Sequence, residues 1–356
     1  MRLVSVVGAR PQFVKLAPIA DACKQVGVEH LIIHTGQHYD PMLSDVFFSD
    51  LGIAAPDIHL GVGSGSQGQQ TGAMLAALDE ALPSLSPDWV LVYGDTNSTL
   101  AAAISAVKMH LPLAHLEAGL RSFNRAMPEE HNRILTDHAA DLLLAPTDVA
   151  ATHLAHEGLA ERTVVVGDVM TDVLLKVRAT VAGKPSPVGE SLGVANGHYS
   201  LATIHRAENT DSAERLTAVI DSLAQVDHPV VLLAHPRLVA KAKEHGVDLE
   251  RGNIRLHSPI AYPDLIASAL HARGVITDSG GLQKEAFLLR VPCTTVRPET
   301  EWVETVELGW NTLVEPGPAL VEAASRPRPA DTDQAPYGDG CAAQRAVETI
   351  QTYARQ

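Results

Sequence analysis

Aromatic residues are scarce in this chain of 356 residues, where Phe, Trp and Tyr together make up 4%. Proteins that bind single-stranded nucleic acid usually stack bases on aromatic side chains, and binding a phosphate backbone requires an excess of positive charge. Positive charge is also in deficit, because 27 Lys and Arg face 42 Asp and Glu, a formal net charge of −15. We therefore expect no nucleic-acid partner. An anionic ligand would need a local cluster of basic side chains.

Cysteine is equally scarce. Cys23, Cys293 and Cys341 are scattered and show no CxxC or Cys/His spacing, which predicts free thiols in a reducing compartment and neither disulfides nor a zinc site. No apolar run approaches the roughly 20 residues that a membrane-spanning helix needs. The chain enters a strand at once, without the apolar stretch of a signal peptide. We expect a cytoplasmic protein without a membrane segment.

Strand and helix patterns alternate along the chain. Short apolar runs rich in β-branched residues, such as residues 3–7, are typical of strands buried on both faces of a parallel sheet. Helical patterns separate these runs, and this βαβ series predicts a doubly wound parallel sheet. A second series begins at residue 199, and 356 residues are too many for one ordinary core. We predict an α/β fold of two Rossmann-like domains, residues 1–167 and 168–340, with a ligand cleft between them.

Two stretches lack any periodicity. Residues 183–198 are rich in Gly, Pro and Ser, and residues 315–340 hold several prolines. We expect a surface connection in the first and little regular structure in the second.

The stretch of residues 112–138 is the strongest candidate for acid–base chemistry. It begins as an apolar strand, turns at Ala118-Gly119 and ends in a helix that we expect to begin at Pro128. Glu117 directly follows the strand, where an α/β sheet opens its ligand crevice. Glu129 follows at the start of the helix. Arg121 and Arg133 lie in the same stretch, so carboxylates and cations converge within 27 residues.

Two other strand ends in the first half carry polar residues. Gly8 follows the first strand and would let backbone N–H groups approach a phosphate, with Arg10 and Lys15 adding positive charge. Asp95 follows the strand WVLVY; it is the expected N-cap of the next helix, and it also points into the crevice. The segment GSGSQG at residues 63–68 matches GxGxxG, but a weak preceding strand makes a flexible loop the better interpretation than a nicotinamide site.

The second half repeats this arrangement. His205 and Arg206 end its first strand, and His235 ends the next one before Pro236 and Arg237. Together with Arg10, Lys15 and His38, these residues form the local cationic cluster that an anionic ligand would require, with protonated histidines offsetting pyrophosphate charge.

The sequence TDSGGLQKE at residues 277–285 is the strongest nucleotide signal. It brings Ser279, Gly280 and Gly281 from a strand to a helix start, where backbone donors and the helix dipole favour a diphosphate. Glu285 lies one turn into that helix, where a carboxylate can accept both hydroxyls of a ribose.

Eight segments together resemble the non-hydrolysing UDP-N-acetylglucosamine 2-epimerase family, in order and spacing along nearly the whole chain. They are GARPQFVKLAP, TGQHYD, VYGDTNSTLAAA, HLEAGLR, MPEEHNRILTDH, TIHRAEN, TDSGGLQKEA and ETEWVE. The Arg10-Pro11-Gln12 opening favours the non-hydrolysing branch over the hydrolysing one.

The resemblance implies the GT-B architecture, with a C-terminal helix at residues 341–356 packing back on the first domain, and a dimer. It also implies inversion at C2 of the sugar without added cofactor or metal. UDP would leave to give a 2-acetamidoglucal intermediate and then return.

The same resemblance implies roles for individual residues. Asp95, Glu117 and Glu129 match the family's acidic trio, and His205 matches its active-site histidine. Residues in both domains match substrate-binding positions of the family, and the resemblance assigns Glu285 to the ribose. The predicted binding residues are Arg10, Lys15, His38, Arg206, His235, Ser279, Gly280, Gly281 and Glu285. Glu130 is expected to be structural, paired with Arg133 three residues later.

Two features leave alternatives open. Residues 35–40 read TGQHYD instead of the TAQH-type segment of members regulated by their own substrate, so we do not expect that allosteric site. The TGQHYD segment resembles a subgroup that includes epimerases of UDP-2,3-diacetamido glucuronic acid, and so do SFNRAMPEE and ETEWVE. The sugar of the substrate therefore stays open between N-acetylglucosamine and a modified derivative. A GT-B glycosyltransferase and a non-catalytic sugar-nucleotide sensor are the competing functions.

Overall fold

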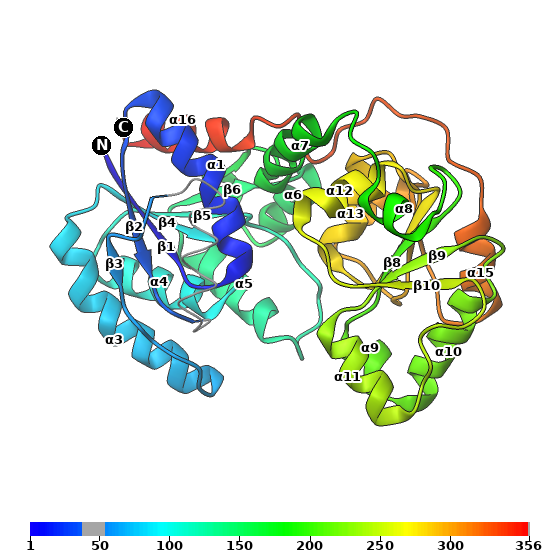
Figure 1. The fold of residues 1–356 in the computed structure, drawn as a ribbon. Helices are drawn as coiled ribbons and strands as arrows, with labels where there is room; N and C mark the ends of the chain where they lie inside the picture. The colour runs from blue at the N-terminus through cyan, green and yellow to red at the C-terminus, as the bar shows by residue number, and fades with distance from the viewer. Residues whose placement is uncertain (38–53, 355–356) are drawn as a thin grey trace. The chain divides into compact units, whose positions relative to one another are not determined.

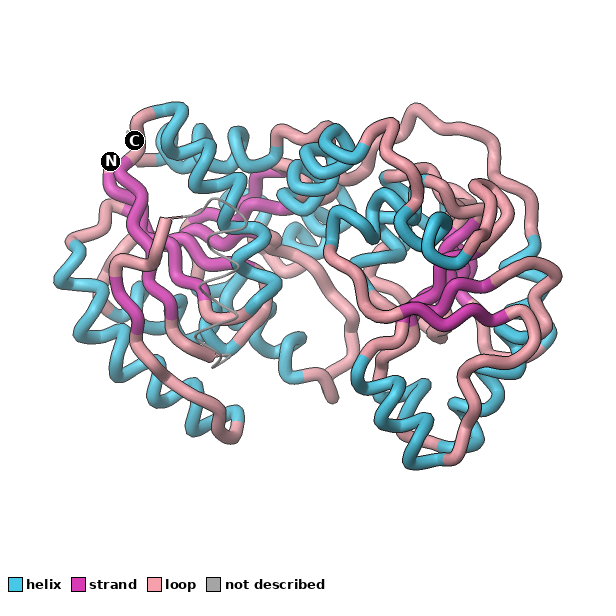
Figure 2. The backbone as a smooth tube through the Cα atoms, in the orientation of Figure 1, coloured by secondary structure: helices cyan, strands magenta, loops and turns pink. Residues whose placement is uncertain are grey.

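The computed structural model describes residues 1–37 and 54–354, apart from the side chain of Arg10. The chain divides into two compact units, one of Met1–Val173 with Ala335–Gln356 and one of Leu174–Gln334. Each unit contains one parallel sheet with helices on both faces (Figure 1 and Figure 2). The predicted α/β class with doubly wound sheets is therefore confirmed. No helix in the described ranges is long and apolar enough to cross a bilayer.

The first unit is built on a sheet whose described strands run in the order β3-β2-β1-β4-β5-β6-β7, every pair parallel. The order reverses beside β1, which is where doubly wound sheets open a ligand crevice at the carboxyl ends of their strands. The strands are β1 (Arg2–Val7), β2 (Glu29–His34), β3 (Ile58–His59), β4 (Trp89–Tyr93), β5 (Leu113–Leu116), β6 (Leu142–Ala145) and β7 (Thr163–Val165). The helices are α1 (Arg10–Val26), α3 (Gln67–Leu85), α4 (Asn97–Lys108), α5 (Pro128–Ala139), α6 (Asp148–His156), the 3-10 turn Ala160–Arg162, the start of α7 (Val169–Val181) and α16 (Ala342–Tyr353).

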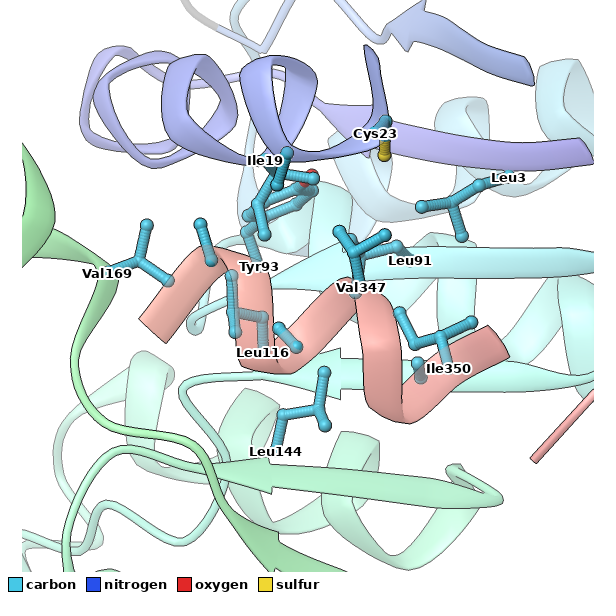
Figure 3. Packing of buried hydrophobic residues seen from close by; sticks show 14 of the residues in the cluster. Leu3, Ile19, Cys23, Leu91, Tyr93, Leu116, Leu144, Val169, Val347 and Ile350 are labelled. Atoms are coloured by element: carbon cyan, nitrogen blue, oxygen red, sulfur yellow. The ribbon is translucent and has the colours of Figure 1, made fainter. Parts of the chain in front are cut away.

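The C-terminal helix α16 belongs to the first unit, because its apolar face packs on α1 and the sheet. Val347 and Ile350 are fully buried in the cluster that also contains Ile19 and Cys23 of α1 (Figure 3). Asp172 accepts hydrogen bonds from the first two N–H groups of α16, at 3.0 and 2.8 Å. A segment more than 150 residues away in sequence from α7 thus completes this core.

The second unit repeats the plan with the described strand order β10-β9-β8-β11-β12-β13, again all parallel. Apolar clusters cover both faces of this sheet. Its strands are β8 (Ser200–Thr203), β9 (Val230–Leu233), β10 (Ile254–His257), β11 (Gly274–Thr277), β12 (Cys293–Thr295) and β13 (Asn311–Leu313). Its helices are α8 (Pro187–Leu192), α9 (Ala207–Thr210), α10 (Ala213–Ala224), α11 (Pro236–His245), α12 (Tyr262–Leu270), α13 (Gly280–Leu288), α14 (Val303–Glu307) and α15 (Pro318–Ser325).

One local prediction was wrong and two others were incomplete. Asp95 is not an N-cap, because α4 begins later and Thr96 caps it by accepting from the Thr99 N–H at 3.3 Å. The expected surface connection at residues 183–198 contains α8, whose Ser186 cap and Pro187 start are short local signals. The expected irregular region at residues 315–340 contains α15, which buries Leu320 in the core. Short helices that depend on burial leave little periodicity in the sequence.

Candidate active site

The carboxyl edge of the first sheet brings Lys15 and Glu117 into direct contact. Glu117 follows β5, and the Lys15 ammonium on α1 forms an ion pair with its carboxylate. The side chains are only 13% and 15% exposed. Burial would lower the pKa of Lys15, but the carboxylates of Glu117, Asp95 and Asp168 outweigh that effect and raise it. Lys15 is therefore held as a cation against the predicted catalytic carboxylate.

Glu117 also has an unusual backbone. Its φ of 73° lies in the left-handed region, which is uncommon for a residue with a Cβ and is often found at functional sites. Hydrogen bonds from its own N–H and that of Ala118 to the carbonyl oxygen of Leu144, at 3.1 and 3.2 Å, hold the chain there. The fold stabilises a conformation that directs this carboxylate to Lys15.

Asp95 lies in the turn after β4 and is held by α5. Its carboxylate pairs with Arg133 at 3.0 Å, and its backbone oxygen accepts from the Asn132 side chain at 2.9 Å. Burial raises the pKa of Asp95 above its usual value, while Arg133 opposes the rise. The charges of Glu117 and Glu129 raise this pKa further. The first unit thus gathers Lys15, Asp95 and Glu117 at one edge of its sheet, and Glu129 is exposed in the first turn of α5, where its charge acts on Asp95.

The prediction that Glu130 is structural agrees with its contacts. Glu130 pairs with Arg133 at 3.0 Å and accepts hydrogen bonds from the N–H groups of Ser122 and Phe123, at 3.0 and 2.9 Å. Burial would raise the pKa of Glu130, but the bonds from Ser122 and the charge of Arg133 lower it below its usual value. This ionised side chain fixes the loop that precedes α5.

Two backbone donors of the loop after β1 are already bonded to the start of α1. The N–H groups of Gly8 and Ala9 both donate to the side-chain oxygen of Gln12, at 2.8 and 3.0 Å. Gly8 is required for close packing, since a Cβ there would lie 2.0 Å from the Thr35 hydroxyl. Arg10 is the first residue of α1. Its side chain and the whole of His38 lie outside the described residues.

A buried carboxylate organises the carboxyl edge of the second sheet. Asp278, which follows β11, accepts from the backbone N–H groups of His205 and Arg206 at 3.0 and 2.9 Å and lies 3.1 Å from the His205 Nδ1. Burial would raise the pKa of Asp278, but its bonds to His205 and Arg206 lower it. We did not predict a role for Asp278, although its place directly after a strand was a usable signal.

His235 lies beside His205, with ring centroids 5.2 Å apart. Burial and the neighbouring His205 lower the pKa of His235. A lowered pKa disfavours the protonated form of His235, since burial and the neighbouring His205 both oppose its charge. The role of a protonated His235 in offsetting pyrophosphate charge stays a prediction.

The start of α13 has the backbone geometry that favours an anion. Ser279 caps the helix by accepting from the Leu282 N–H at 3.4 Å, and Gly280 and Gly281 form its first turn. A Cβ on Gly280 would lie 3.7 Å from the Arg206 guanidinium and 3.8 Å from that of Arg297. The Glu301 carboxylate, which pairs with Arg297 at 3.1 Å, lies equally close, so Arg206 is the guanidinium here without that neutralising partner in the pair. Sequence reasoning missed Arg297.

Glu285 lies one turn further along α13, as predicted, and is 8% exposed. The Tyr262 hydroxyl donates to its carboxylate at 2.8 Å. One carboxylate oxygen is thereby oriented. Tyr262 is a second group that the sequence did not single out.

Three smaller observations follow. A small cavity in the first unit is lined by Lys15, Leu116, Glu117, Pro146, Gly167, Asp168 and Val169. Asp168, which was not predicted, thus shares a cavity with Lys15 and Glu117. The GxGxxG-like segment is a loop up to Ser66, which caps α3, and its last two residues begin that helix. In the described ranges no group of three or more His, Cys, Asp or Glu could hold a metal ion.

Comparison with known proteins identifies the family. A family model described as UDP-N-acetylglucosamine 2-epimerase matches residues 21–351. The chain belongs to the UDP-N-acetylglucosamine 2-epimerase family. The resemblance predicted from the eight segments is confirmed, and the chain is an isomerase.

Individual relatives of this epimerase chain cover almost its whole length. It is 43% identical over 361 residues to a UDP-N-acetylglucosamine 2-epimerase homolog of Methanococcus maripaludis, covering 98% of this chain and 99% of the relative. It is 44% identical over 362 residues to the UDP-2,3-diacetamido-2,3-dideoxy-D-glucuronate 2-epimerase of Pseudomonas aeruginosa, with the same two coverages.

Among solved structures, the UDP-GlcNAc 2-epimerase of Methanocaldococcus jannaschii in complex with UDP-GlcNAc and UDP matches with a TM-score of 0.84 at 37% identity. That match covers 99% of this chain and 100% of the other. The predicted GT-B class of this epimerase chain is confirmed.

Proposed function

We propose that this chain inverts C2 of a UDP-N-acetylhexosamine without net hydrolysis, through loss and return of UDP. The observation that carries the proposal is the cluster of Lys15, Asp95 and Glu117 at the carboxyl edge of the first sheet, where Glu117 has a left-handed backbone. Such a group of coupled ionisable residues, with perturbed pKa values for Lys15 and Asp95, is typical of acid–base sites. Family membership supplies the reaction class.

The order of steps follows from the acidity of the C2 proton. That proton is not adjacent to a carbonyl, so its direct removal would give an unstabilised carbanion. When the C1–O bond breaks and its electron pair leaves with UDP, C1 acquires oxocarbenium character. A carboxylate then takes the C2 proton, and the C–H electron pair forms the C1=C2 double bond of a 2-acetamidoglucal. Protonation at C2 on the opposite face and return of the UDP oxygen to C1 complete the inversion.

Carboxylates suit both parts of this reaction, because they stabilise a developing cation and move a proton, as in glycosidases. We propose Asp95, Glu117 and Glu129 for these tasks and His205 as a fourth catalytic group. The charge of Lys15 keeps Glu117 oriented and balances the carboxylates.

The leaving diphosphate must be bound tightly enough to return. In the second unit the start of α13 offers Ser279, Gly280 and Gly281 with Arg206 close by, and these groups suit a pyrophosphate. We propose Glu285 for the ribose hydroxyls. Arg10, Lys15, His38 and His235 stay predictions as further binding residues.

Epimerisation in deuterated water tests the proposal. UDP-N-acetylglucosamine and the UDP-diacetamido-glucuronate sugar are each incubated with the enzyme, and mass spectrometry and NMR follow C2. We expect deuterium at C2 together with the epimer, loss of both in Glu117→Gln, and retention in Glu80→Gln, an exposed control on α3. Absence of exchange and epimer for both sugars would refute the proposal. Sugar transfer to an acceptor without C2 exchange would instead indicate a GT-B glycosyltransferase, and UDP binding without turnover a sensor.

The sugar itself stays open, because relatives named for the two substrate types are 43% and 44% identical to this chain. Comparison of kcat/KM for the two UDP-sugars in one assay decides between them. Assembly as a homodimer and a location in the cytoplasm also stay predictions, and sedimentation analysis tests the first.

A further inference from the structure

A wholly buried histidine lies directly beneath the two turns that carry Asp95 and Glu117. His115 is the third residue of β5 and is 0% exposed. Its Nε2 is 2.8 Å from the carbonyl oxygen of Gly94, the residue before Asp95. A carbonyl oxygen can only accept, so this ring nitrogen donates. His115 thus ties the strand that leads to Glu117 to the turn that holds Asp95.

Asp137 extends the same connection to the other side of Glu117. Its carboxylate is 2.7 Å from the His115 Nδ1, and its second oxygen accepts from the Gly119 N–H at 3.2 Å and pairs with Arg121 at 2.7 Å. The side chain is 0% exposed. One carboxylate therefore fixes the end of the turn that starts at Glu117, and through His115 it also fixes the turn before Asp95.

Helix α5 is the common support of these contacts. Glu129, Arg133 and Asp137 follow one another at intervals of four residues, so they lie along one face of the helix. Arg133 holds the Asp95 carboxylate and Asp137 holds the His115 ring. The proposed catalytic Glu129 thus lies on α5, the same helix that holds the turns of Asp95 and Glu117.

Stability alone is a weak reason for this network. A buried group of ions often contributes no more free energy of folding than apolar side chains of the same volume, because its desolvation is costly. Its position between the turns of Asp95 and Glu117 indicates a geometric task, since a displacement of about 1 Å in a reacting group can cost about 100-fold in rate.

We propose that His115 and Asp137 are positioning residues that fix the Asp95 and Glu117 turns relative to each other and to α5. Neither side chain reaches the substrate; they act through the Gly94 carbonyl and the Gly119 N–H. The catalytic part of this inference rests on the proposed function, whereas the structural part concerns the two turns and is independent of it.

Kinetics of four variants of the full chain test the catalytic part. Asp137→Asn removes the charge at almost constant volume, His115→Phe removes both ring contacts, and His115→Gln keeps a donor for the Gly94 carbonyl. His30→Phe is the matched control, since His30 is bonded to Ser5 at 2.8 Å at the other end of the same sheet. We expect kcat to fall about 100-fold in Asp137→Asn and His115→Phe, with KM within about threefold, and to recover partly in His115→Gln. His30→Phe should keep its kcat.

Backbone hydrogen exchange, followed by mass spectrometry, tests the structural part without any turnover. Asp137→Asn and His115→Phe should speed exchange in peptides covering residues 93–97 and 117–121, and His30→Phe should not. Unchanged exchange in both turns, or an equal loss of kcat in His30→Phe, would overturn the inference. If the parent protein turns over no UDP-sugar, the proposed function fails, and the exchange result still decides whether the network fixes the turns.

Discussion

At the scale of single residues, the ion pair of Lys15 and Glu117 affects both the proposed chemistry and the stability of the first unit. Both side chains are largely buried, and removing one partner of a buried ion pair leaves an uncompensated charge. The two charges therefore depend on each other energetically as well as chemically.

We predict that Lys15→Met lowers the free energy of unfolding by about 3 kcal/mol, because the Glu117 charge loses its partner. Urea unfolding measures the change. The double variant Lys15→Met with Glu117→Gln should recover most of the loss, since neither charge is then buried alone. A double variant less stable than Lys15→Met would contradict this account.

Glu130 gives a pH prediction in the same unit. Its pKa is lowered in the folded state, so its contribution to stability is complete above the unfolded value of about 4.3 and is lost as the pH falls through the folded pKa. We expect Glu130→Gln to be less stable than the parent by about 2 kcal/mol at pH 7. The difference should shrink below about pH 4. Unfolding curves at several pH values measure it, and a constant difference would exclude a charge effect.

At the scale of elements, the turn after Glu117 must pass close to α6. Gly119 has a φ of 83°, and a Cβ there would lie 2.4 Å from the Ala150 carbonyl oxygen. Gly158 has a similar φ of 79°, but nothing lies within 4 Å of a Cβ at that position. The two glycines therefore separate backbone strain from crowding.

We predict that Gly158→Ala costs about 1 kcal/mol through its left-handed backbone alone. Gly119→Ala should cost about 3 kcal/mol, because overpacking adds to the same strain. Thermal and urea unfolding give both values. Equal losses would show that the chain near α6 moves aside easily.

At the scale of the whole molecule, the chain returns to its first unit through α16. Ile350 is fully buried in that core (Figure 3), and Asp172 fixes the helix start. The C-terminal residues therefore contribute to the stability of the unit that carries the proposed catalytic carboxylates.

We predict that Ile350→Ala destabilises the first unit by about 3 kcal/mol and that Glu348→Ala, on the exposed side of α16, changes stability by less than about 0.5 kcal/mol. The three tryptophans can report on each unit. Trp89 lies in the first unit, and Trp302 and Trp310 lie in the second. In a chain that lacks Trp302 and Trp310, Ile350→Ala should shift the unfolding transition that Trp89 reports. In a Trp89→Phe chain, Ile350→Ala should leave the transition that Trp302 and Trp310 report unchanged. Equal shifts would mean that the two units unfold together.

The sequence predicted the strand ends well, because buried parallel strands are short apolar runs followed by polar residues. Glu117 and Asp278 both follow such runs, although we assigned a role only to the first. The N-cap prediction for Asp95 was wrong because Thr96 and Asp95 are both good caps, and only the pairing of Asp95 with Arg133 on α5 decided between them. The lowered pKa of His235 was not foreseen from the sequence, because part of it comes from His205, a neighbour 30 residues away in sequence.

The sequence by itself determined the class of the fold, the family and the acidic residues at the carboxyl edges of the strands, because local periodicity and ordered segments encode these features. Only the tertiary structure showed that Lys15 pairs with Glu117, that Asp95 is held by Arg133, and that His115 and Asp137 join the two turns. Those contacts link residues 18 to 102 positions apart. Burial and charge at such distances depend on how the sheet and α5 pack, and no spacing in the sequence records that packing.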